Sequence, residues 1–379
     1  MKKKILIFSH EFPPMQGGEG TYAFELAKSL NKLNFEVHVL AGTVLNKKFD
    51  SKIIDNELLE KGILITRHDW VNKDRLWFFT WKKIFLNYIK KHSKFDNIFF
   101  ANFSALVVGH RLSKKILNSI KYSTTLHGDD IFYFFSNRKF FKSLILINHF
   151  KKNYFFQRSQ NNICVSEHAK NMLHRYTKKF KVSIVHHGIE EREVTNLPKI
   201  DSKKKFIFVY PSRIEKMKGQ KEWVDIVYSS QELKEKIFTI FIGDGTEKNN
   251  IENFVIKKGL KDNFKFLGQI PRYKLFEYIK KSDIVISLSN HPSETFGIII
   301  LESMMLKKAL ILFNRPVLKS ILNSDEAWLV DYQNASSKIS ELINNNENIQ
   351  LLAKKGYERY KEDYCNISMA NKTCKILNL

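Results

Sequence analysis

Residues 291–305 read His-Pro-Ser-Glu-Thr-Phe-Gly-Ile-Ile-Ile-Leu-Glu-Ser-Met-Met, and they follow a short apolar run at residues 284–288. That run, Ile-Val-Ile-Ser-Leu, is typical of a strand that is buried on both faces of a parallel sheet. The polar turn after it is therefore expected at the carboxyl edge of the sheet, where open α/β sheets bind their ligands.

A helix is expected to begin at Gly297, because the apolar residues that follow recur at helical spacing. The backbone N–H groups of residues 295–298 would then point out of the helix start, which favours an anionic group there. Glu294 lies just before the helix and Glu302 lies within it, with seven residues between them. Two carboxylates so placed can hold different parts of one long polar ligand. The alternative is an ordinary amphipathic helix with two solvated glutamates.

A second informative stretch runs from the apolar residues 206–210 into a basic turn. Arg213 offers a planar guanidinium and Lys218 a compact charge, both between an expected strand and an expected helix. Such a pair suits a diphosphate. In so basic a chain, a solvated basic loop is the alternative.

These two stretches resemble motifs of the retaining glycosyltransferases of family 4, which have the GT-B fold. Residues 292–302 match the frame Pro-Ser-Glu-x-Phe-Gly-x-x-x-x-Glu, and residues 212–219 are similar to the family pattern Ser-Arg-Leu-x-x-x-Lys-Gly. In that family the first glutamate contacts hydroxyls of the donor sugar, the second binds the ribose, and the Phe-Gly amides meet the sugar and the diphosphate.

The resemblance implies a catalytic role for Glu294. It also implies donor-binding roles for Arg213, Lys218, Gly243, Ile270, Thr295, Phe296, Gly297, Ile298 and Glu302. Of these, Gly243 lies in a tight turn after an expected strand at residues 238–242, and Ile270 lies in the turn where family members hold the nucleobase through backbone groups.

The amino-terminal half carries weaker matches to the same family. Gly17 and Gly18 follow an expected first strand at residues 5–9 and resemble a Gly-Gly loop that faces the donor phosphates; a plain structural turn is the alternative. His127 ends an expected strand and begins His-Gly-Asp-Asp, which resembles the family's His-Gly-x-Asp, whose histidine reaches the reacting sugar. The resemblance makes His127 a catalytic candidate, although a lone histidine at a strand end is more often structural.

The length of 379 residues favours two domains of similar size. Two series of alternating strands and helices are separated by the charged, aperiodic residues 191–204. The expected fold is α/β, with two doubly wound Rossmann-like domains facing each other across a cleft, as in GT-B. We expect an acceptor-side domain at 1–195, a nucleotide-sugar domain at 205–360, and a terminal helix at 361–379 that crosses back to the first domain.

The formal net charge of +24 favours anionic partners, namely nucleic acid, an acidic membrane leaflet or phosphorylated ligands. Basic and aromatic residues alternate at 70–95 and 131–156, which suits an anionic membrane surface; helices with aromatic residues in the core are the alternative. No run is long enough to span a membrane, and residues 1–8 favour a strand over a signal peptide. We therefore expect a cytoplasmic protein, peripheral on the inner face of the plasma membrane.

Three cysteines without metal-ligand spacing indicate neither a disulfide framework nor a zinc site. Adjacent His186 and His187 are also poorly spaced for zinc. No Asp-x-Asp site accompanies the other motifs, so Arg213 and Lys218 are expected to replace a metal ion at the diphosphate. We expect no metal and no cofactor besides the nucleotide sugar.

The resemblance implies transfer of a hexose or N-acetylhexosamine, with retention, from a UDP- or GDP-linked sugar to a glycan or lipid-linked acceptor in bacterial cell-surface polysaccharide synthesis. A GT-B nucleotide-sugar epimerase is the nearest alternative. A retaining glycosidase would need carboxyl groups about 5 Å apart, which the spacing of Glu294 and Glu302 does not readily supply. A basic nucleic-acid-binding protein is disfavoured, since the basic residues are dispersed and no recognised nucleic-acid motif is present.

Overall fold

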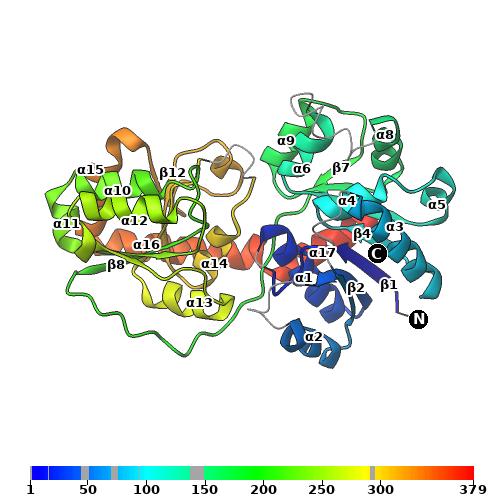
Figure 1. Cartoon of the computed structure of the whole chain (residues 1–379), viewed down its shortest axis with the longest axis horizontal. Coiled ribbons are helices and arrows are strands. Elements are labelled where there is room, and N and C mark those ends of the chain that lie inside the picture. Colours follow the sequence, from blue (N-terminus) through cyan, green and yellow to red (C-terminus); the bar gives the residue numbers. More distant parts are fainter. Residues whose placement is uncertain are drawn as a thin grey trace. The chain divides into compact units, whose positions relative to one another are not determined.

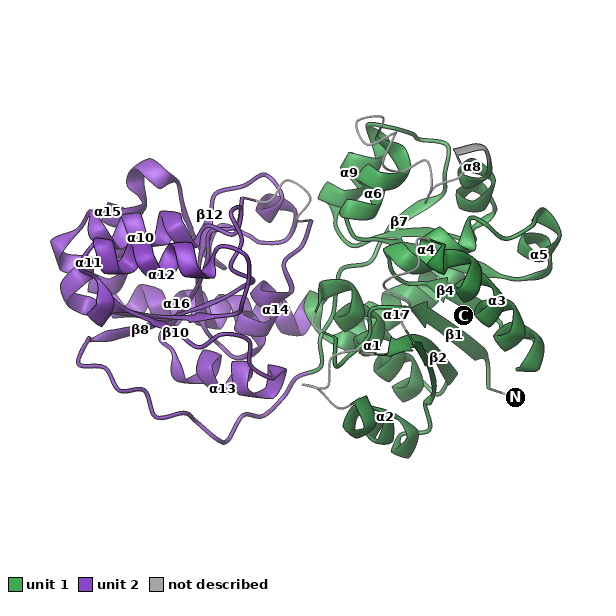
Figure 2. Cartoon of the chain, viewed as in Figure 1, with its two compact units in different colours: residues 1–190, 363–379 green, residues 191–362 purple. Residues whose placement is uncertain are grey.

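The computed structural model describes residues 2–15, 17–43, 51–69, 76–92, 94–136, 149–290 and 295–379 (Figure 1). The contacts divide the chain into two compact units (Figure 2). Unit 1 comprises Met1–Glu190 and Asp363–Leu379, and unit 2 comprises Glu191–Glu362. Each unit has its own parallel sheet and its own apolar core.

The strands of unit 1 are β1 (Lys4–Ser9), β2 (Glu36–Thr43), β3 (Leu64–Asp69), β4 (Asn97–Phe100), β5 (Tyr122–Leu126), β6 (Asn162–Cys164) and β7 (Val182–Ile184). Within the described residues they form one parallel sheet of seven strands in the order β3-β2-β1-β4-β5-β6-β7. The order reverses between β1 and β4, and ligands bind at the carboxyl edge of such a switch point. Nearly every residue of β1, β4 and β5 is buried, so both faces of the sheet are covered.

The helices of unit 1 are α1 (Gly18–Lys32), α2 (Ser51–Glu60), α3 (Trp77–Lys91), α4 (Phe103–Gly109), α5 (Lys114–Ser119), α6 (Asp129–Phe135), α8 (His149–Arg158), α9 (Glu167–His174) and α17 (Asn366–Leu377). Helix α17 packs against α1, and buried residues of both helices belong to one core cluster. Lys3 Nζ donates to the Asn378 carbonyl at 3.3 Å, so the two ends of the chain lie side by side. The returning segment therefore completes unit 1.

Helix α3 carries the first stretch of alternating basic and aromatic residues. Its aromatic side chains Phe78, Trp81, Phe85 and Tyr88 are buried. The core interpretation therefore holds for these four residues. Phe79 stays half-exposed. Residues 70–75 and, in the second stretch, residues 137–148 lie outside the described residues.

The strands of unit 2 are β8 (Phe206–Pro211), β9 (Ile237–Ile242), β10 (Phe264–Phe266), β11 (Ile284–Ser287), β12 (Ala309–Phe313) and β13 (Trp328–Val330). The described residues form a parallel sheet of six strands in the order β10-β9-β8-β11-β12-β13. Here the switch point lies between β8 and β11. The strand expected at 284–288 thus lies at the centre of a parallel sheet, as predicted.

The α-helices of unit 2 are α10 (Gln220–Tyr228), α11 (Gln231–Lys236), α12 (Lys248–Lys257), α13 (Arg272–Lys281), α14 (Ile298–Met305), α15 (Ala335–Asn344) and α16 (Asn346–Arg359). Short helical turns are η2 (Lys261–Asn263), η3 (Leu318–Ser320) and η4 (Tyr332–Asn334), and the π-helix η5 (Tyr360–Tyr364) follows α16. The ring of Trp223 on α10 stacks on Phe208 of β8 at 5.6 Å, which anchors that helix to the sheet. Within the described ranges, no helix combines the length and the apolar character that a membrane span requires.

The structure differs from the sequence-based expectation in two places in unit 1. The sequence predicts a single helix near residues 105–118, but the structure has two helices there, α4 and α5. The break follows from Ser113, whose hydroxyl accepts the Ile116 N–H at 3.4 Å and starts a new helix. Helix α2 and strand β3 were not predicted. Both are partly exposed, so their apolar pattern is weak.

Candidate functional site

The loop after β8 carries the two predicted phosphate-binding cations. Val209 of β8 lies opposite Val285 of β11, so the carboxyl ends of these strands lie level at the switch point. The Arg213 side chain is 72% exposed, and its Nη1 lies 2.7 Å from a carboxylate oxygen of Glu215. Gln220 Nε2 donates to the Arg213 carbonyl at 2.9 Å and holds the loop. An exposed ion pair contributes only about 0–1 kcal/mol, so Arg213 can exchange Glu215 for a phosphate at little cost.

Tyr210 joins this loop to the end of β11. Its hydroxyl donates to the Lys218 carbonyl and accepts the Leu288 N–H at 2.8 Å. Beside this contact, the Asn290 N–H donates to the Met217 carbonyl at 2.9 Å. Tyr210 is fully buried, where unmade hydrogen bonds are costly, so the two loops keep one geometry. The backbone that carries Lys218 therefore lies beside the residues that lead into the Phe-Gly motif.

Two glycines permit the close approach of these loops. Gly219 has φ +81°, and a Cβ there would lie 2.2 Å from the Leu288 carbonyl oxygen. Gly243, which follows β9, has φ +144°, and a Cβ there would lie 2.1 Å from the Ser212 carbonyl oxygen. No other residue type fits either position without a shift of the backbone. Gly243 thus belongs to the packing of the site, and its contact with the donor stays a prediction.

Ile270 lies in the turn after β10 and is partly exposed. The N–H of Gly243 donates to the Gly268 carbonyl at 2.9 Å, which places this turn beside the turn after β9. The loops that follow β8, β9 and β10 are therefore adjacent. The contact of Ile270 with a nucleobase stays a prediction.

The Phe-Gly motif lies between β11 and α14. Thr295 and Phe296 are buried, and Gly297 and Ile298 form the start of α14. Residues 291–294 lie outside the described residues, so the structure gives no position for the predicted catalytic Glu294. The first N–H groups of a helix lack partners within it, which provides donors for an anionic group beside Phe296.

Glu302, predicted to bind the ribose, is buried on α14 beside Arg272. One of its carboxylate oxygens lies 2.8 Å from Nε and 2.7 Å from Nη2 of Arg272. Arg272 begins α13, and its guanidinium lies 5.2 Å from the centre of the Phe276 ring. Paired contacts from a planar guanidinium fix the orientation of a carboxylate. Arg272 therefore positions Glu302 and compensates its buried charge.

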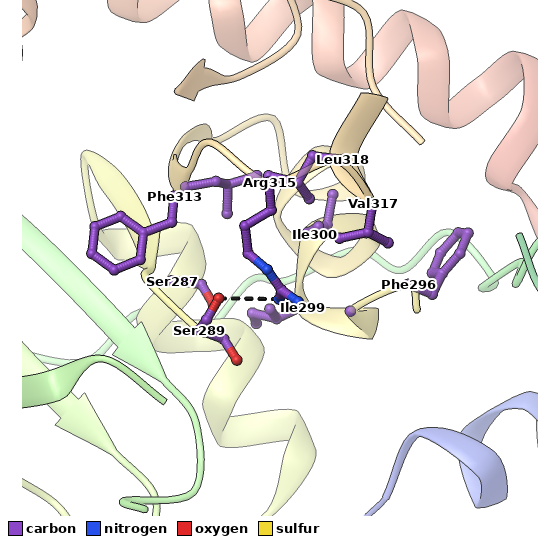
Figure 3. A pocket seen from close by; sticks show the side chains of 11 residues that line it. Ser287, Ser289, Phe296, Ile299, Ile300, Phe313, Arg315, Val317 and Leu318 are labelled. Carbon is purple, nitrogen blue, oxygen red and sulfur yellow. Dashed lines mark hydrogen bonds between the residues drawn. The ribbon is translucent and has the colours of Figure 1, made fainter. Parts of the chain in front are cut away.

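A pocket opens at the carboxyl ends of β11 and β12 (Figure 3). Ser287 and Ser289 line it from the end of β11, and Phe296 and Gly297 line it from the motif. Arg315, from the segment after β12, donates from Nη1 to the Ser289 carbonyl at 3.1 Å. The pocket thus brings motif residues to a cation that the sequence did not single out.

In unit 1, His127 lies at the end of β5 in a loop that Asp130 holds. The Asp130 carboxylate accepts the N–H groups of His127, Gly128 and Ile131, each at 2.8 Å. Burial raises the pKa of Asp130 to about 6, against the effect of these hydrogen bonds. Hydrogen bonds from the loop's own backbone to Asp130 therefore fix the loop conformation.

The His127 ring has a defined tautomer. Its Nε2 lies 3.0 Å from the Ala101 carbonyl, which can only accept, so Nε2 carries the hydrogen and Nδ1 is the acceptor. Burial lowers the pKa of His127 to about 4, although the Ala101 carbonyl opposes this shift. A ring that is neutral at physiological pH can accept a hydrogen bond from a hydroxyl.

Two further rings pack around His127. The Tyr22 and His187 ring centres lie 5.2 Å and 5.4 Å from it, and 5.1 Å from each other. Burial raises the pKa of Tyr22 to about 12. Burial lowers the pKa of His187 well below its ordinary value, and the electrostatic effects of the neighbouring His127 and His186 rings add to this shift. His187 is therefore a neutral packing partner of His127.

Gly17 and Gly18 lie at the start of α1, after β1. A carboxylate oxygen of Glu11 accepts the Gly20 N–H at 2.7 Å, so an acidic side chain already occupies this helix start. Glu19 in the same turn has a raised pKa, because of burial and then of the charges of Glu11 and Asp130. Donor phosphates that reach Gly17 and Gly18 would have to share the helix start with Glu11.

Each unit thus gathers its own predicted residues at the carboxyl ends of its strands. Unit 1 holds Gly17, Gly18 and His127. Unit 2 holds the remaining donor-binding candidates, and the predicted catalytic Glu294 lies outside the described residues. Arg272, Arg315, Tyr22 and His187 join these sites without having been predicted as site residues.

Two family models match the chain in sequence. Residues 16–193 match Glycosyltransferase Family 4, and residues 193–359 match Glycosyl transferases group 1. Together these models match most of unit 1 and most of unit 2, and residues 360–379 lie beyond them.

Individual relatives agree with this family. The chain is 30% identical over 264 residues to the uncharacterized glycosyltransferase MJ1178 of Methanocaldococcus jannaschii, which is 67% of each chain. It is 25% identical over 206 residues to the O-antigen biosynthesis glycosyltransferase WclY of Escherichia coli, covering 52% of this chain and 56% of WclY. The crystal structure of Anabaena Alr3699/HepE in complex with UDP and glucose has a TM-score of 0.75 at 17% identity over 99% of both chains. The chain is therefore a family 4 glycosyltransferase with the GT-B fold.

Proposed function

We propose that this enzyme is a retaining glycosyltransferase that moves a hexose or an N-acetylhexosamine from a UDP- or GDP-linked sugar to a glycan or lipid-linked acceptor. The observation that carries the proposal is the convergence of the Lys218 loop and the residues directly after β11 through the Tyr210 hydroxyl. The HepE structure, which holds UDP and glucose, supports a nucleotide-sugar donor. The name of WclY supports a role in cell-surface polysaccharide synthesis.

The departing nucleoside diphosphate leaves negative charge that the site must stabilise. Arg213, Lys218 and the backbone N–H groups at the start of α14 meet this need electrostatically. We assign no metal ion and no cofactor besides the nucleotide sugar, and we expect activity to persist in excess EDTA.

The remaining candidates hold the two ends of the donor. Glu302, oriented by Arg272, accepts hydrogen bonds from the ribose hydroxyls. Glu294 and the Nδ1 atom of His127 accept hydrogen bonds from hydroxyls of the donor sugar. Fixing the sugar in this way supplies part of the rate enhancement through orientation.

Retention follows from attack on the face of the sugar that the diphosphate leaves. The acceptor oxygen bonds to the anomeric carbon as the bond from that carbon to the phosphate oxygen breaks, and the leaving diphosphate takes the acceptor's proton. NMR of the product tests this assignment. A product with inverted anomeric configuration would overturn retention.

A thermal-shift screen with UDP, GDP, ADP and their sugars tests the donor class. We expect a uracil or guanine nucleotide to raise the melting temperature of the wild type, and Arg213→Ala and Lys218→Ala to reduce that effect. Lys216→Ala is the matched control, because Lys216 is an exposed cation in the same loop. Donor incubated with enzyme alone provides a second control, since conversion to another sugar without an acceptor would indicate an epimerase.

The acceptor is proposed to be presented at an anionic membrane surface on the cytoplasmic side. The net charge of +24 supports this placement, because basic proteins are attracted to acidic leaflets.

A further inference from the structure

Arg315 lines the same pocket as Phe296 and Gly297 (Figure 3). Among the described residues that line this pocket, Arg315 is the one that carries a charge. Most of its neighbours there are apolar, namely Ile299, Ile300, Phe313, Val317 and Leu318. A guanidinium against such walls is partly removed from water, which strengthens its hydrogen bonds to anionic groups.

A hydrogen bond anchors this guanidinium to the segment after β11. Nη1 of Arg315 donates to the Ser289 carbonyl at 3.1 Å, and the Ser289 hydroxyl donates to the Met217 carbonyl at 3.4 Å. The segment around Ser289 therefore links Arg315 on one side to the Lys218 loop on the other. A guanidinium has five N–H donors in one plane, so it can contact more than one acceptor.

The start of α14 adds to the positive potential of the pocket. Ile299 and Ile300 lie in the first turn of this helix and line the pocket with Arg315. Figure 3 shows the guanidinium end of Arg315 extending toward Ser289 and Ile299. A helix start carries about half a positive charge. Two independent sources of positive potential thus meet in one apolar-walled pocket, which favours an anionic oxygen group.

We propose that Arg315 binds an anionic oxygen group of the nucleotide sugar and so takes part in selecting the donor. The group is an oxygen of the diphosphate or a carboxylate on the sugar, as in a uronic acid. This inference rests on the proposed function, because Phe296 and Gly297 are the residues proposed to meet the sugar and the diphosphate. It adds a specificity-determining residue from outside the motif.

Isothermal titration calorimetry of the 379-residue chain tests the proposal. The ligands are uridine, UDP, UDP-glucose and UDP-glucuronate, or the guanine series with GDP-mannose and its uronate if the wild type prefers guanine. We expect Arg315→Gln to weaken binding of at least one anionic ligand about tenfold to a hundredfold, the loss expected for one hydrogen bond to a charged group. Arg315→Lys keeps the charge but loses the planar guanidinium. Its affinity for that ligand should lie between those of the wild type and Arg315→Gln.

The pattern of losses identifies the anionic group. Weaker binding of UDP and of both sugars assigns Arg315 to the diphosphate, and weaker binding of the uronate alone assigns it to the sugar carboxylate. Lys319→Gln removes the same charge from an exposed position on η3 and should leave every affinity unchanged.

Uridine separates direct binding from a damaged site. It carries no anionic group, so its affinity should not change in Arg315→Gln. Equal weakening of uridine, or wild-type affinity of Arg315→Gln for all four ligands, would overturn the proposal while leaving the proposed function intact. A wild type that binds no nucleotide or nucleotide sugar would overturn both.

Discussion

At the scale of single residues, variants of Arg272 and Glu302 distinguish the pair's contribution to folding stability from its contribution to donor binding. Arg272→Met keeps much of the side-chain volume and leaves the carboxylate buried without its cation. We expect the free energy of unfolding to fall by about 3 kcal/mol, near the lower limit of the cost of breaking a buried ion pair, because Arg272 is 26% exposed. The Michaelis constant for the donor should rise as well. Chemical denaturation and initial-rate kinetics measure the two effects.

The double variant Arg272→Met/Glu302→Leu is the control for this pair. Replacing both partners by apolar side chains should restore most of the stability. It should not restore donor affinity, because the proposed ribose contact is gone. Recovery of the donor affinity together with the stability would contradict the role given to Glu302.

The neutral ring of His127 predicts a flat pH dependence. Its pKa of about 4 lies below the ordinary value of 6.5, so the folded state favours the neutral form. The stability that this group contributes is present above its ordinary pKa and is lost as the pH falls toward about 4. We therefore expect no His127 ionisation in kcat/KM between about pH 6 and about pH 8.

Two variants complete this test. His127→Asn can keep an acceptor near the position of Nδ1, so it should retain more activity than His127→Ala. If the pH profile of kcat/KM shows an ionisation near the ordinary histidine pKa, and this ionisation disappears in His127→Asn, the neutral assignment is contradicted.

For residues within local motifs, the sequence predicted a position near a strand end, because the motif spacing determines where each residue lies relative to the strand. It did not predict Arg272, whose partner Glu302 is 30 positions away on another helix. It did not predict Arg315 either, which reaches Ser289 from 26 positions away. Contacts of this kind depend on the strand order, and a single sequence carries no local signal for them.

At the scale of elements, Gly219 sets the distance between the Lys218 loop and the end of β11. Gly219→Ala combines an unfavourable positive φ with a Cβ 2.2 Å from the Leu288 carbonyl. The loop must move, so we expect lower stability and at least about tenfold weaker donor binding, since a misplaced charge-assisted hydrogen bond costs that much. Calorimetric titration and thermal unfolding measure both.

Gly62→Ala provides the matched control for Gly219→Ala. Gly62 has φ +79°, and nothing lies within 4 Å of a Cβ placed there. This variant should pay only the conformational penalty of about 1–2 kcal/mol and keep its donor affinity. Equal donor affinities in the two variants would show that the close approach at Gly219 does not position the site.

Elements with a strong local pattern were predicted well. The strands β9 and β11 were expected from apolar runs, and β5 was expected ahead of the His-Gly-Asp-Asp turn. Ser166, directly before Glu167 and His168, also predicts a helix N-cap, and its hydroxyl accepts the Ala169 N–H at 3.1 Å at the start of α9. The orientation of α3 was left open. Its basic and aromatic residues fit a lipid surface as well as a core, and only its packing against the sheet decides between them.

At the scale of the whole molecule, the net charge of +24 predicts association with anionic vesicles. In unit 1, burial and then the charges of Lys151 and Arg111 lower the pKa of Lys82, so three basic side chains lie near one another there. We expect co-sedimentation with phosphatidylglycerol vesicles at low salt and release at about 0.5 M salt, where screening is short-ranged.

Zwitterionic vesicles control for contacts that do not depend on charge. They should leave the protein in the supernatant under the same conditions. A protein that remains in the supernatant with anionic vesicles at low salt would remove the proposed membrane placement and leave the transferase proposal untouched.

The return of residues 363–379 to unit 1 has a consequence for synthesis on the ribosome. Met369 is fully buried in the core of unit 1, and the Asn366 N–H donates to the Ile189 carbonyl at 3.1 Å. These partners leave the exit tunnel only after all of unit 2 has been translated. The core of unit 1 is thus completed only after unit 2 has been synthesised, although most of unit 1 is translated first. Until then the side of α1 that packs against α17 is exposed to chaperones and proteases.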